Sequence, residues 1–205
     1  EELIHGKQRY CLWIDESQVD AARQSRFISE RLQRVKEFRG RSKAAATAGW
    51  ASKSYRFVQI PGFGQRWTIA VAGVSSERRE YLPVDLLDAN SIISNALFGI
   101  YDAPLWNMAV IASRIHLVWI ATVCGKLKTD YRYSNTLGWN TFPVPPLTDQ
   151  NKADLTRCAE DILLAREAHW PATIADLYDP DAMPADLRAA HDKNDDTLER
   201  IYIGR

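Results

Sequence analysis

The segment PLWNMAVIASRIHLVWIATVC, residues 104–124, contains the most apolar run of this chain. Its apolar residues recur at helical spacing, a proline stands at an early position, and a glycine follows its last residue. These features are typical of a helix from Pro104 to Cys124. Almost every face of this helix would be apolar, so we expect it to be buried at the centre of the fold. His116 within it is then predicted to be a hydrogen-bonded core histidine rather than a catalyst.

The same segment does not predict a membrane protein. Arg114 and His116 interrupt its apolar part, which falls short of the roughly 18 to 20 residues that span a bilayer. The N-terminus has neither the basic start nor the apolar core of a signal peptide. With 46% hydrophobic and 25% charged residues, the composition is that of an ordinary soluble globular protein. The three scattered cysteines indicate a reduced, cytoplasmic setting, and neither cysteines nor histidines show a metal-ligand spacing.

Short runs rich in strand-forming residues precede the helix in the sequence. The predicted strands are Tyr10–Ile14, Tyr55–Ile60, Arg66–Ala72, Tyr81–Val84 and Ser91–Ile100. The second and third of these are expected to form a hairpin through a Pro/Gly turn. Residues 40–54 are small, polar and unpatterned, as in a loop. We therefore predict an α/β fold of the α+β kind, with a mixed or antiparallel sheet packed on the central buried helix.

A basic helix is predicted near the start of the chain. From Ser17 to Arg39, apolar residues recur at intervals that fit one helix. Between Arg23 and Lys43, eight basic residues stand against two acidic ones. A solvated helix face explains part of this bias. The rest favours contact with DNA phosphates, where lysine and arginine gain affinity by releasing condensed counterions. Within this helix, Arg31 and Arg34 are the predicted contacts to the DNA backbone.

The zero net charge of the chain hides an asymmetry between its two parts. Residues 1–147 contain 19 basic and 13 acidic residues, and residues 148–205 contain 7 and 13. The prolines of FPVPP, at 142–146, cannot continue a helix or a central strand, so a domain boundary is predicted between these two parts. Two helices, at 148–169 and 184–202, would then form an acidic helical hairpin that packs on the first domain.

In the stretch after the central helix, GKLKTDYRYS at 125–134, charged and uncharged residues alternate from Lys126 to Tyr133. As one extended strand, it would have one charged and one uncharged face. The charged face would carry Lys126, Lys128, Asp130 and Arg132, and the uncharged face would carry Leu127, Thr129, Tyr131 and Tyr133. Lysine, aspartate and arginine are donor and acceptor types that read base edges in the DNA major groove. A solvated strand face also mixes charges, so composition alone leaves both interpretations open.

Two hydroxyls and two arginines crowd into the segment VSSERRE, which begins at Val74. One interpretation is a polar turn that leads into the next strand. The other is a phosphate clamp, because hydroxyl and guanidinium groups both donate hydrogen bonds to phosphate oxygens. The clamp would consist of Ser75, Ser76, Arg78 and Arg79. The residues by themselves do not decide between the two interpretations.

Several blocks of this sequence together resemble one enzyme family. SSERREYLPV, FGI, RIHLVWIATVCGKLKTDYRYS, NTFPVPP and ADLYDPDAMPADLRAAH occur in the order and spacing found in the C-terminal part of the MmeI-like type II restriction-modification enzymes. The resemblance covers most of residues 55–205. It implies that the chain is the target recognition domain of such an enzyme, at 1–147, followed by its C-terminal helical segment, at 148–205.

Enzymes of this family combine a nuclease, an S-adenosylmethionine-dependent adenine-N6 DNA methyltransferase and a target recognition domain. The resemblance implies that this chain binds double-stranded DNA beside the methyltransferase domain of the same parent chain, in the cytoplasm of a bacterium or archaeon. Neither an Asn-Pro-Pro-aromatic motif nor a glycine-rich cofactor loop occurs here. S-adenosylmethionine, and Mg for any nuclease, would therefore be bound elsewhere in the parent enzyme. The chain alone is not expected to bind a cofactor or to transfer a methyl group.

The resemblance also implies roles for the charged strand. Position by position, Lys128 and Asp130 resemble the pair that reads a single base pair, and Arg132 resembles the reader of a neighbouring one. Strand residues two apart face the same way and are roughly 6 to 7 Å apart. Lysine donates to guanine and aspartate accepts from cytosine N4, so the pair would suit a G·C base pair. Exchanging it for Glu/Arg should invert the preference. The predicted clamp and the basic helix would set the register on the DNA backbone.

Two other functions stay open on the sequence alone. The acidic helical hairpin could make the chain a protein-interaction module of a larger assembly. The chain could also be the specificity subunit of a multisubunit restriction system, although such a subunit would carry two recognition units and no internal repeat is visible. A stand-alone hydrolase is disfavoured, because no Ser/His/Asp or Cys/His arrangement follows from the spacing.

Overall fold

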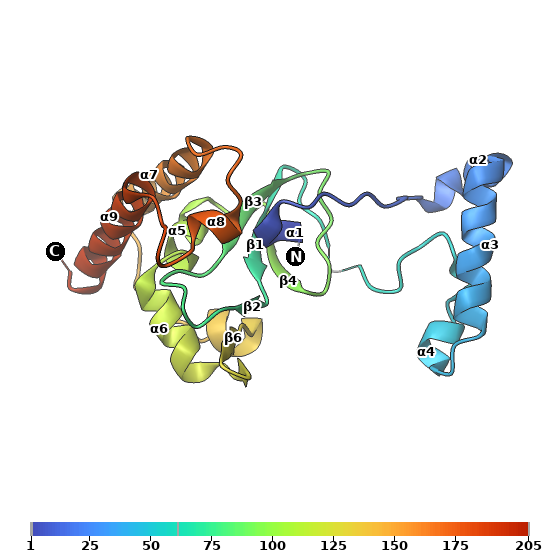
Figure 1. Cartoon of the computed structure of the whole chain (residues 1–205), viewed down its shortest axis with the longest axis horizontal. Coiled ribbons are helices and arrows are strands. Elements are labelled where there is room, and N and C mark those ends of the chain that lie inside the picture. Colours follow the sequence, from blue (N-terminus) through green and yellow to red (C-terminus); the bar gives the residue numbers. More distant parts are fainter. Residues whose placement is uncertain (1, 61, 205) are drawn as a thin grey trace. The chain divides into compact units, whose positions relative to one another are not determined.

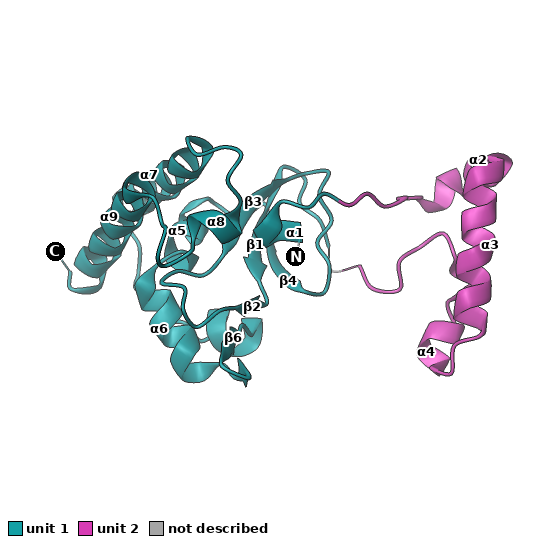
Figure 2. Cartoon of the chain, viewed as in Figure 1, with its two compact units in different colours: residues 1–8, 61–205 teal, residues 9–60 magenta. Residues whose placement is uncertain are grey.

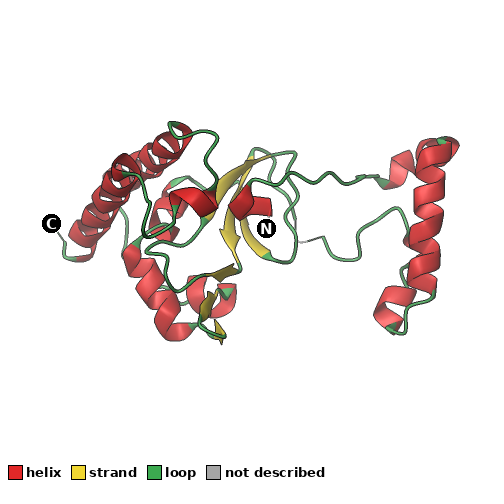
Figure 3. Ribbon diagram, viewed as in Figure 1, coloured by secondary structure: helices red, strands yellow, loops and turns green. Residues whose placement is uncertain are grey.

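The computed structural model describes residues 2–60 and 62–204, and the chain divides into two compact units. Residues 1–8 and 61–205 form unit 1, and residues 9–60 form unit 2, which is inserted close to the start of the chain (Figure 2). Every strand within the described residues belongs to unit 1, and both units contain helices (Figure 3). None of the described helices is long and apolar enough to cross a membrane.

A three-stranded antiparallel sheet lies at the centre of unit 1 (Figure 1). Strand β1 (Trp67–Ala72) is its middle strand, with β3 (Val84–Asp88) on one side and β4 (Leu97–Tyr101) on the other. The sequence WTIAVA suits this position, because the last five residues of β1 are buried and both of its edges are paired. Thr68 stands opposite Leu87 on one neighbour and opposite Tyr101 on the other.

A second antiparallel sheet contains shorter strands. In order across the sheet, these are β2 (Val74–Ser75), β6 (Asp130–Arg132) and β5 (Lys126–Leu127). A π-helical turn, η3 (Asn135–Trp139), follows β6. Gly138 of this turn packs closely on α6 (Arg114–Val123), and a Cβ atom there would force the side chain of Ile120 to shift. Both sheets are antiparallel, which agrees with the predicted fold class.

The sequence located some strands correctly and others not. The strand at 66–72 is confirmed, whereas the strands predicted at 81–84 and 91–100 begin later, as β3 and β4. The strands predicted at Tyr10–Ile14 and Tyr55–Ile60 are wrong, and so is the hairpin between the second of them and β1. Both stretches lie in unit 2, where the described residues offer no neighbouring strand to pair with their backbone.

The apolar segment at 104–124 forms two consecutive helices rather than one. Helix α5 (Trp106–Ile111) is buried over almost its whole length, and α6 (Arg114–Val123) follows after a break. Ser113 makes this break, because its backbone is extended and its Oγ accepts a hydrogen bond from the backbone N–H of His116 (3.2 Å), as an N-cap does. The prediction of a buried central helix is confirmed, and its single continuous course is corrected.

Two long helices lie side by side at the C-terminal end, α7 (Asp149–Glu167) and α9 (Ala185–Tyr202), with the short α8 (Ile174–Leu177) between them in sequence (Figure 1). Both long helices are confirmed as predicted. Thr148 caps α7 reciprocally with Asn151, each side chain bonding the backbone of the other. The N-terminal helix α1 (Glu2–His5) packs against α8.

The C-terminal helices share the core of unit 1. Helix α7 packs on α5, and its Leu155 and Ile162 are fully buried together with Ile69 of β1 and Met108 of α5. Leu187 of α9 belongs to the same cluster. The core is continuous across the boundary predicted between residues 147 and 148, so the division of the chain at that point stays a prediction.

Unit 2 consists of helices with almost no buried interior. Its elements are η1 (Glu16–Gln18), α2 (Val19–Gln24), α3 (Arg26–Gly40), α4 (Ala45–Ala48) and η2 (Ala51–Lys53). The helix predicted at 17–39 is confirmed with a break at Ser25, whose Oγ caps α3. The loop predicted at 40–54 is corrected, because it contains α4 and η2. Val19 is the only buried residue among residues 9–60, all of which the structure describes.

Hydrogen bonds from Arg39 help to hold unit 2 together. Its guanidinium group donates to the backbone carbonyls of Trp50 (3.2 Å), Lys53 (2.9 Å) and Arg56 (2.8 Å). The planar, multiply donating guanidinium group suits such a cluster of carbonyls better than an ammonium group does. Helix α3 is thereby tied to the segment that follows α4.

Candidate nucleic-acid interface

The charged segment after α6 is a β-hairpin rather than one strand. Strands β5 and β6 pair antiparallel, with Leu127 opposite Asp130, so Lys128 and Thr129 form the two-residue turn between them. Lys128 has a positive φ of 58°, which two-residue hairpin turns commonly require. The prediction of a single extended strand is therefore wrong. The dipeptides Asn-Gly and Asp-Gly are typical of such a turn, whereas the Lys-Thr found at this position does not indicate one.

The hairpin rearranges the predicted base-reading residues. Lys128 lies at the exposed tip, Arg132 is exposed on β6, and Asp130 is half-buried. Lys128 and Asp130 do not share a strand face, which corrects the geometry expected for that pair. Asp130 and Arg132 are two apart within β6 and do share one. Within residues 2–60 and 62–204, the side chains of Lys128 and Arg132 make no hydrogen bond or ion pair.

The opposite side of the hairpin is anchored in the core. Tyr133 is 5% exposed, its backbone N–H donates to the carbonyl of Gly73 (3.0 Å), and its Oη lies 3.2 Å from Nε2 of His116. Burial lowers the pKa of His116 to about 4, so the ring is neutral at pH 7. The prediction that His116 is a hydrogen-bonded core histidine is confirmed. Tyr131 is half-buried, and Nζ of Lys126 lies 5.5 Å from its ring centroid.

One residue of the predicted phosphate clamp is buried, and two others have hydrogen-bond or ion-pair partners within the protein. Ser75 is 2% exposed and stands opposite Tyr131 in the second sheet, so its hydroxyl cannot reach a phosphate in this structure. Ser76 Oγ accepts a hydrogen bond from the backbone N–H of Arg78 (3.3 Å). The guanidinium group of Arg78 lies 2.7 Å from the carboxylate of Asp181.

Arg79, the last member of the predicted clamp, is half-buried. Burial lowers the pKa of Arg79, and the carboxylates of Asp130 and Asp179 oppose that shift through their charge. Asp179 and Asp181 lie in the C-terminal part of the chain, for which the sequence had suggested packing on the first domain or docking of a protein partner. Their acidic character was visible in the sequence, but their neighbours were not.

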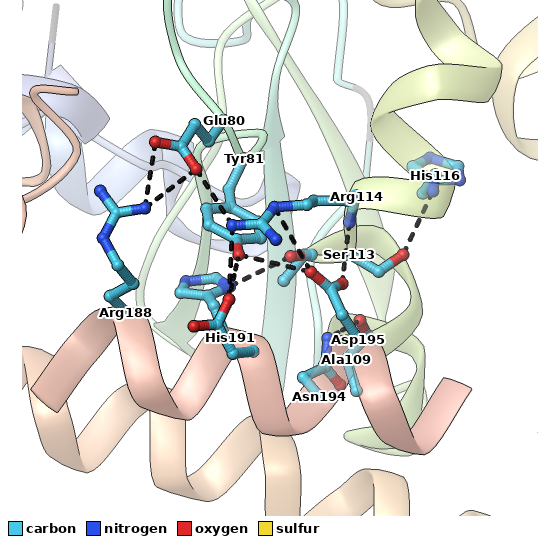
Figure 4. A network of polar contacts seen from close by, with 12 residues as sticks. Glu80, Tyr81, Ala109, Ser113, Arg114, His116, Arg188, His191, Asn194 and Asp195 are labelled. Atoms are coloured by element: carbon cyan, nitrogen blue, oxygen red, sulfur yellow. Dashed lines mark hydrogen bonds and ion pairs between the residues drawn. The ribbon is translucent and has the colours of Figure 1, made fainter. Parts of the chain in front are cut away.

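A second polar cluster joins α9 to the start of α6 (Figure 4). The Asp195 carboxylate accepts a hydrogen bond from the backbone N–H of Arg114 (2.9 Å) and one from Tyr81 Oη (3.3 Å). Burial raises the pKa of Asp195 to about 6. Glu80 accepts hydrogen bonds from Arg188 (2.9 and 3.0 Å) and from Arg114 (3.0 Å). These contacts fix α9 against the residues that directly follow the predicted clamp.

The excess of basic over acidic residues within residues 1–147 lies entirely in unit 2. Residues 9–60 contain 11 basic and 5 acidic residues, whereas residues 1–8 and 61–147 together contain eight of each. On α3, Arg26 is paired with Glu30 (2.9 Å) and Arg39 binds carbonyls. Arg31 and Arg34, three positions apart and therefore on one side of α3, have no carboxylate partner within the described residues. Both predicted backbone-binding arginines are thus exposed.

The described residues offer no group of three or more His, Cys, Asp or Glu side chains that could hold a metal ion. Cys11, Cys124 and Cys158 are all free thiols.

Comparison with known proteins gives matches along the whole chain. The family model of the MmeI target recognition domain matches residues 1–146, and that of the MmeI C-terminal domain matches residues 147–205. "DNA methyltransferase A" of Bacillus subtilis (strain 168) is 38% identical over 201 residues, which are 98% of this chain and 23% of that protein. A solved structure of the Type IIL restriction-modification enzyme MmeI in complex with DNA covers the whole chain with a TM-score of 0.93 and 32% identity. The chain spans 27% of that enzyme, so it corresponds to about a quarter of either relative.

Proposed function

The chain belongs to the MmeI family, and we propose that it recognises a specific sequence in double-stranded DNA. It consists of that family's target recognition domain followed by that family's C-terminal domain. The observation that carries this proposal is the hairpin with Lys128 at its tip and Arg132 on β6, both exposed and both without an internal partner in the described structure. Tyr133 anchors the same hairpin in the core. Charged side chains on a firmly mounted element suit the reading of base edges.

The three charged residues have distinct positions in this proposal. Asp130 and Arg132 share a face of β6, and residues so placed are roughly 6 to 7 Å apart. Arginine donates two hydrogen bonds to O6 and N7 of a guanine, and aspartate accepts one from N4 of a cytosine. Lys128 adds a donor from the hairpin tip. All three are proposed as base-reading residues.

Contact with the DNA backbone is proposed for unit 2. Its 11 basic residues against 5 acidic ones favour a polyanion, because each neutralised phosphate releases condensed counterions. Arg31 and Arg34 are the proposed phosphate ligands on α3. Such contacts fix the register and orientation of a protein on the duplex without reading its sequence.

The catalytic step is proposed for the larger enzyme that carries this chain. Its methyltransferase domain, the partner of this chain, would transfer a methyl group from S-adenosylmethionine to N6 of an adenine. Because a base must leave the stack before such chemistry, the role of this chain would be to place the target adenine at that domain. Any nuclease activity would use Mg outside these residues. The expected setting is a bacterial or archaeal cytoplasm.

The proposal is tested by mapping N6-methyladenine in the genome of cells that express the larger enzyme carrying this chain. The variant Lys128→Glu/Asp130→Arg keeps the net charge and exchanges donors for acceptors, so we expect the methylated motif to change at one or two base pairs only. The control is Lys193→Glu/Asp161→Arg, which reverses an exposed ion pair (2.7 Å) between α9 and α7. The control should methylate the wild-type motif. An unchanged motif in the hairpin variant, at full activity, would refute the hairpin as the base-reading element.

A further inference from the structure

The turn at Ser76–Arg79 lies between the hairpin and the C-terminal part of the chain. It leaves the second sheet directly after β2, where Ser75 stands opposite Tyr131 of β6. The backbone N–H of Arg79 donates to the carbonyl of Ser76 (3.2 Å), and that of Arg78 donates to Ser76 Oγ, so the turn is closed on itself. A closed turn carries its side chains in fixed directions.

The charged side chains of this turn point to both neighbours. Glu77 lies 3.7 Å from Nζ of Lys126, at the base of the hairpin. Arg78 lies 2.7 Å from the Asp181 carboxylate. Asp181 is itself held, because its backbone N–H donates to Oδ1 of Asp179 (3.0 Å). The turn therefore contacts the hairpin through the carboxylate of Glu77. It contacts the loop at residues 179–181, the C-terminal loop, through the guanidinium group of Arg78.

The side chain of Arg79 makes no hydrogen bond or ion pair within the described residues, so it acts in this arrangement through its charge alone. It is half-buried, and the charges of Asp130 on the hairpin and Asp179 on the C-terminal loop both act on it. A partly buried guanidinium group needs such carboxylates, since an uncompensated charge there is costly. Directly after Arg79, Glu80 is fixed to Arg188 of α9 (2.9 and 3.0 Å), so the connection is also pinned at its far end (Figure 4).

We propose that the turn Ser76–Arg79 holds the base-reading hairpin against the C-terminal loop 179–181, with Arg78 as a positioning residue that acts through its ion pair with Asp181. This inference rests on the proposed function of the hairpin. It replaces the phosphate clamp predicted for Arg78 and Arg79, and it gives the C-terminal domain a part in sequence recognition without contact to DNA. A base-reading group keeps its selectivity only while neighbouring residues hold its orientation.

The two roles considered for Arg78, phosphate ligand and positioning residue, predict different behaviour toward salt. A phosphate ligand contributes to the affinity for every sequence and to the salt dependence of binding. A positioning residue affects the preference for one base pair and leaves the salt dependence unchanged. The same distinction applies to Asp179 and Asp181, which as carboxylates are unsuited to bind phosphate at all.

The test is selection of duplexes from a random library by the full chain, with salt titrations on the selected and on scrambled sequences. The base pair read by Asp130 is defined as the position whose preference Asp130→Ala removes. We expect Arg78→Ala and Asp181→Asn each to lower the preference at that position by about fivefold or more, within the range of one base-pair contact. Their salt dependence should match that of the wild type.

Two further variants separate positioning from general damage. Arg78→Asp/Asp181→Arg restores the ion pair with reversed polarity and should regain most of the preference that Asp181→Arg alone loses. Asp161→Asn breaks an ion pair of similar exposure away from the hairpin and should change nothing. A full preference in Arg78→Ala, combined with a weaker salt dependence, would overturn the inference and restore the clamp. A wild-type chain that binds all duplexes equally would instead overturn the proposed function itself.

Discussion

Unit 1 and unit 2 differ in both packing and charge. Among the described residues, unit 1 contains every buried side chain except Val19, and it carries 15 basic and 21 acidic residues. Unit 2 carries 11 basic and 5 acidic residues, and hydrogen bonds from Arg39 link its parts in place of a core. One unit is thus well packed and acidic, and the other is sparsely packed and basic.

This difference fits two separate tasks in DNA recognition. Base reading requires fixed side-chain directions, because each base edge presents a specific pattern of donors and acceptors. Phosphate contact requires positive charge near the duplex and tolerates many geometries. The hairpin stands on the core of unit 1, where orientation can be enforced, while the excess of positive charge lies in the unit with almost no core.

The packing difference predicts the largest effect. Ile162→Ala empties a fully buried site on α7 and should lower the free energy of unfolding of unit 1 by about 2 to 5 kcal/mol. Leu32→Ala removes a half-buried side chain on α3 and should cost less than about 1 kcal/mol, since a partly exposed site leaves little cavity. Urea denaturation and hydrogen exchange of each unit measure both changes. Equal losses would contradict the contrast in packing.

The second prediction concerns mild acid, which should act on unit 1 alone. Burial lowers the pKa of His116 to about 4 and that of His191 to about 3, whereas both take up a proton near pH 6.5 in the unfolded chain. The unfolded state therefore binds more protons between these values. The stabilisation from the neutral rings is complete above about pH 6.5 and is lost as the pH falls through 4, by up to about 3 kcal/mol for each histidine.

Two carboxylates, Asp85 and Asp195, oppose this trend in part, because burial raises the pKa of both. Burial raises the pKa of Asp195 to about 6, so its contribution is present below its unfolded pKa of about 4 and is lost as the pH rises through 6. The free energy of unfolding measured from pH 7 to 4 should still fall, and His191→Gln should flatten the curve. Residues 9–60 contain no histidine, so hydrogen exchange in unit 2 serves as the internal control. A curve that does not change with pH would contradict the burial of both rings.

Local pattern was enough to predict much of the fold. The helices at 149–167 and 185–202 and the buried helical segment at 104–124 were visible because apolar residues at helical spacing determine both the element and its buried face. His116 could be placed in the core for the same reason.

The geometry of the candidate site could not be predicted in this way. Alternation in KLKTDYRY fits one strand as well as a tight hairpin, and the turn residues Lys128 and Thr129 carry no turn signal. Ser75 reads as a surface hydroxyl until the pairing of β2 with β6 buries it. Arg78 and Asp181 are 103 positions apart, so their ion pair depends on tertiary packing that no local pattern reports.

The last prediction concerns the basic unit and has the smallest effect. Arg34 on α3 has no partner among the described residues, whereas Arg26 on the same helix is paired with Glu30 (2.9 Å). Arg34→Ala should make the slope of log affinity against log salt shallower by about 0.9, the value of one phosphate contact, and weaken binding equally on every sequence. Arg26→Ala removes the same charge and should leave the slope nearly unchanged. Equal slopes in the two variants would mean that unit 2 attracts DNA through its net charge alone, and a changed sequence preference in Arg34→Ala would mean that the sparsely packed unit reads bases too.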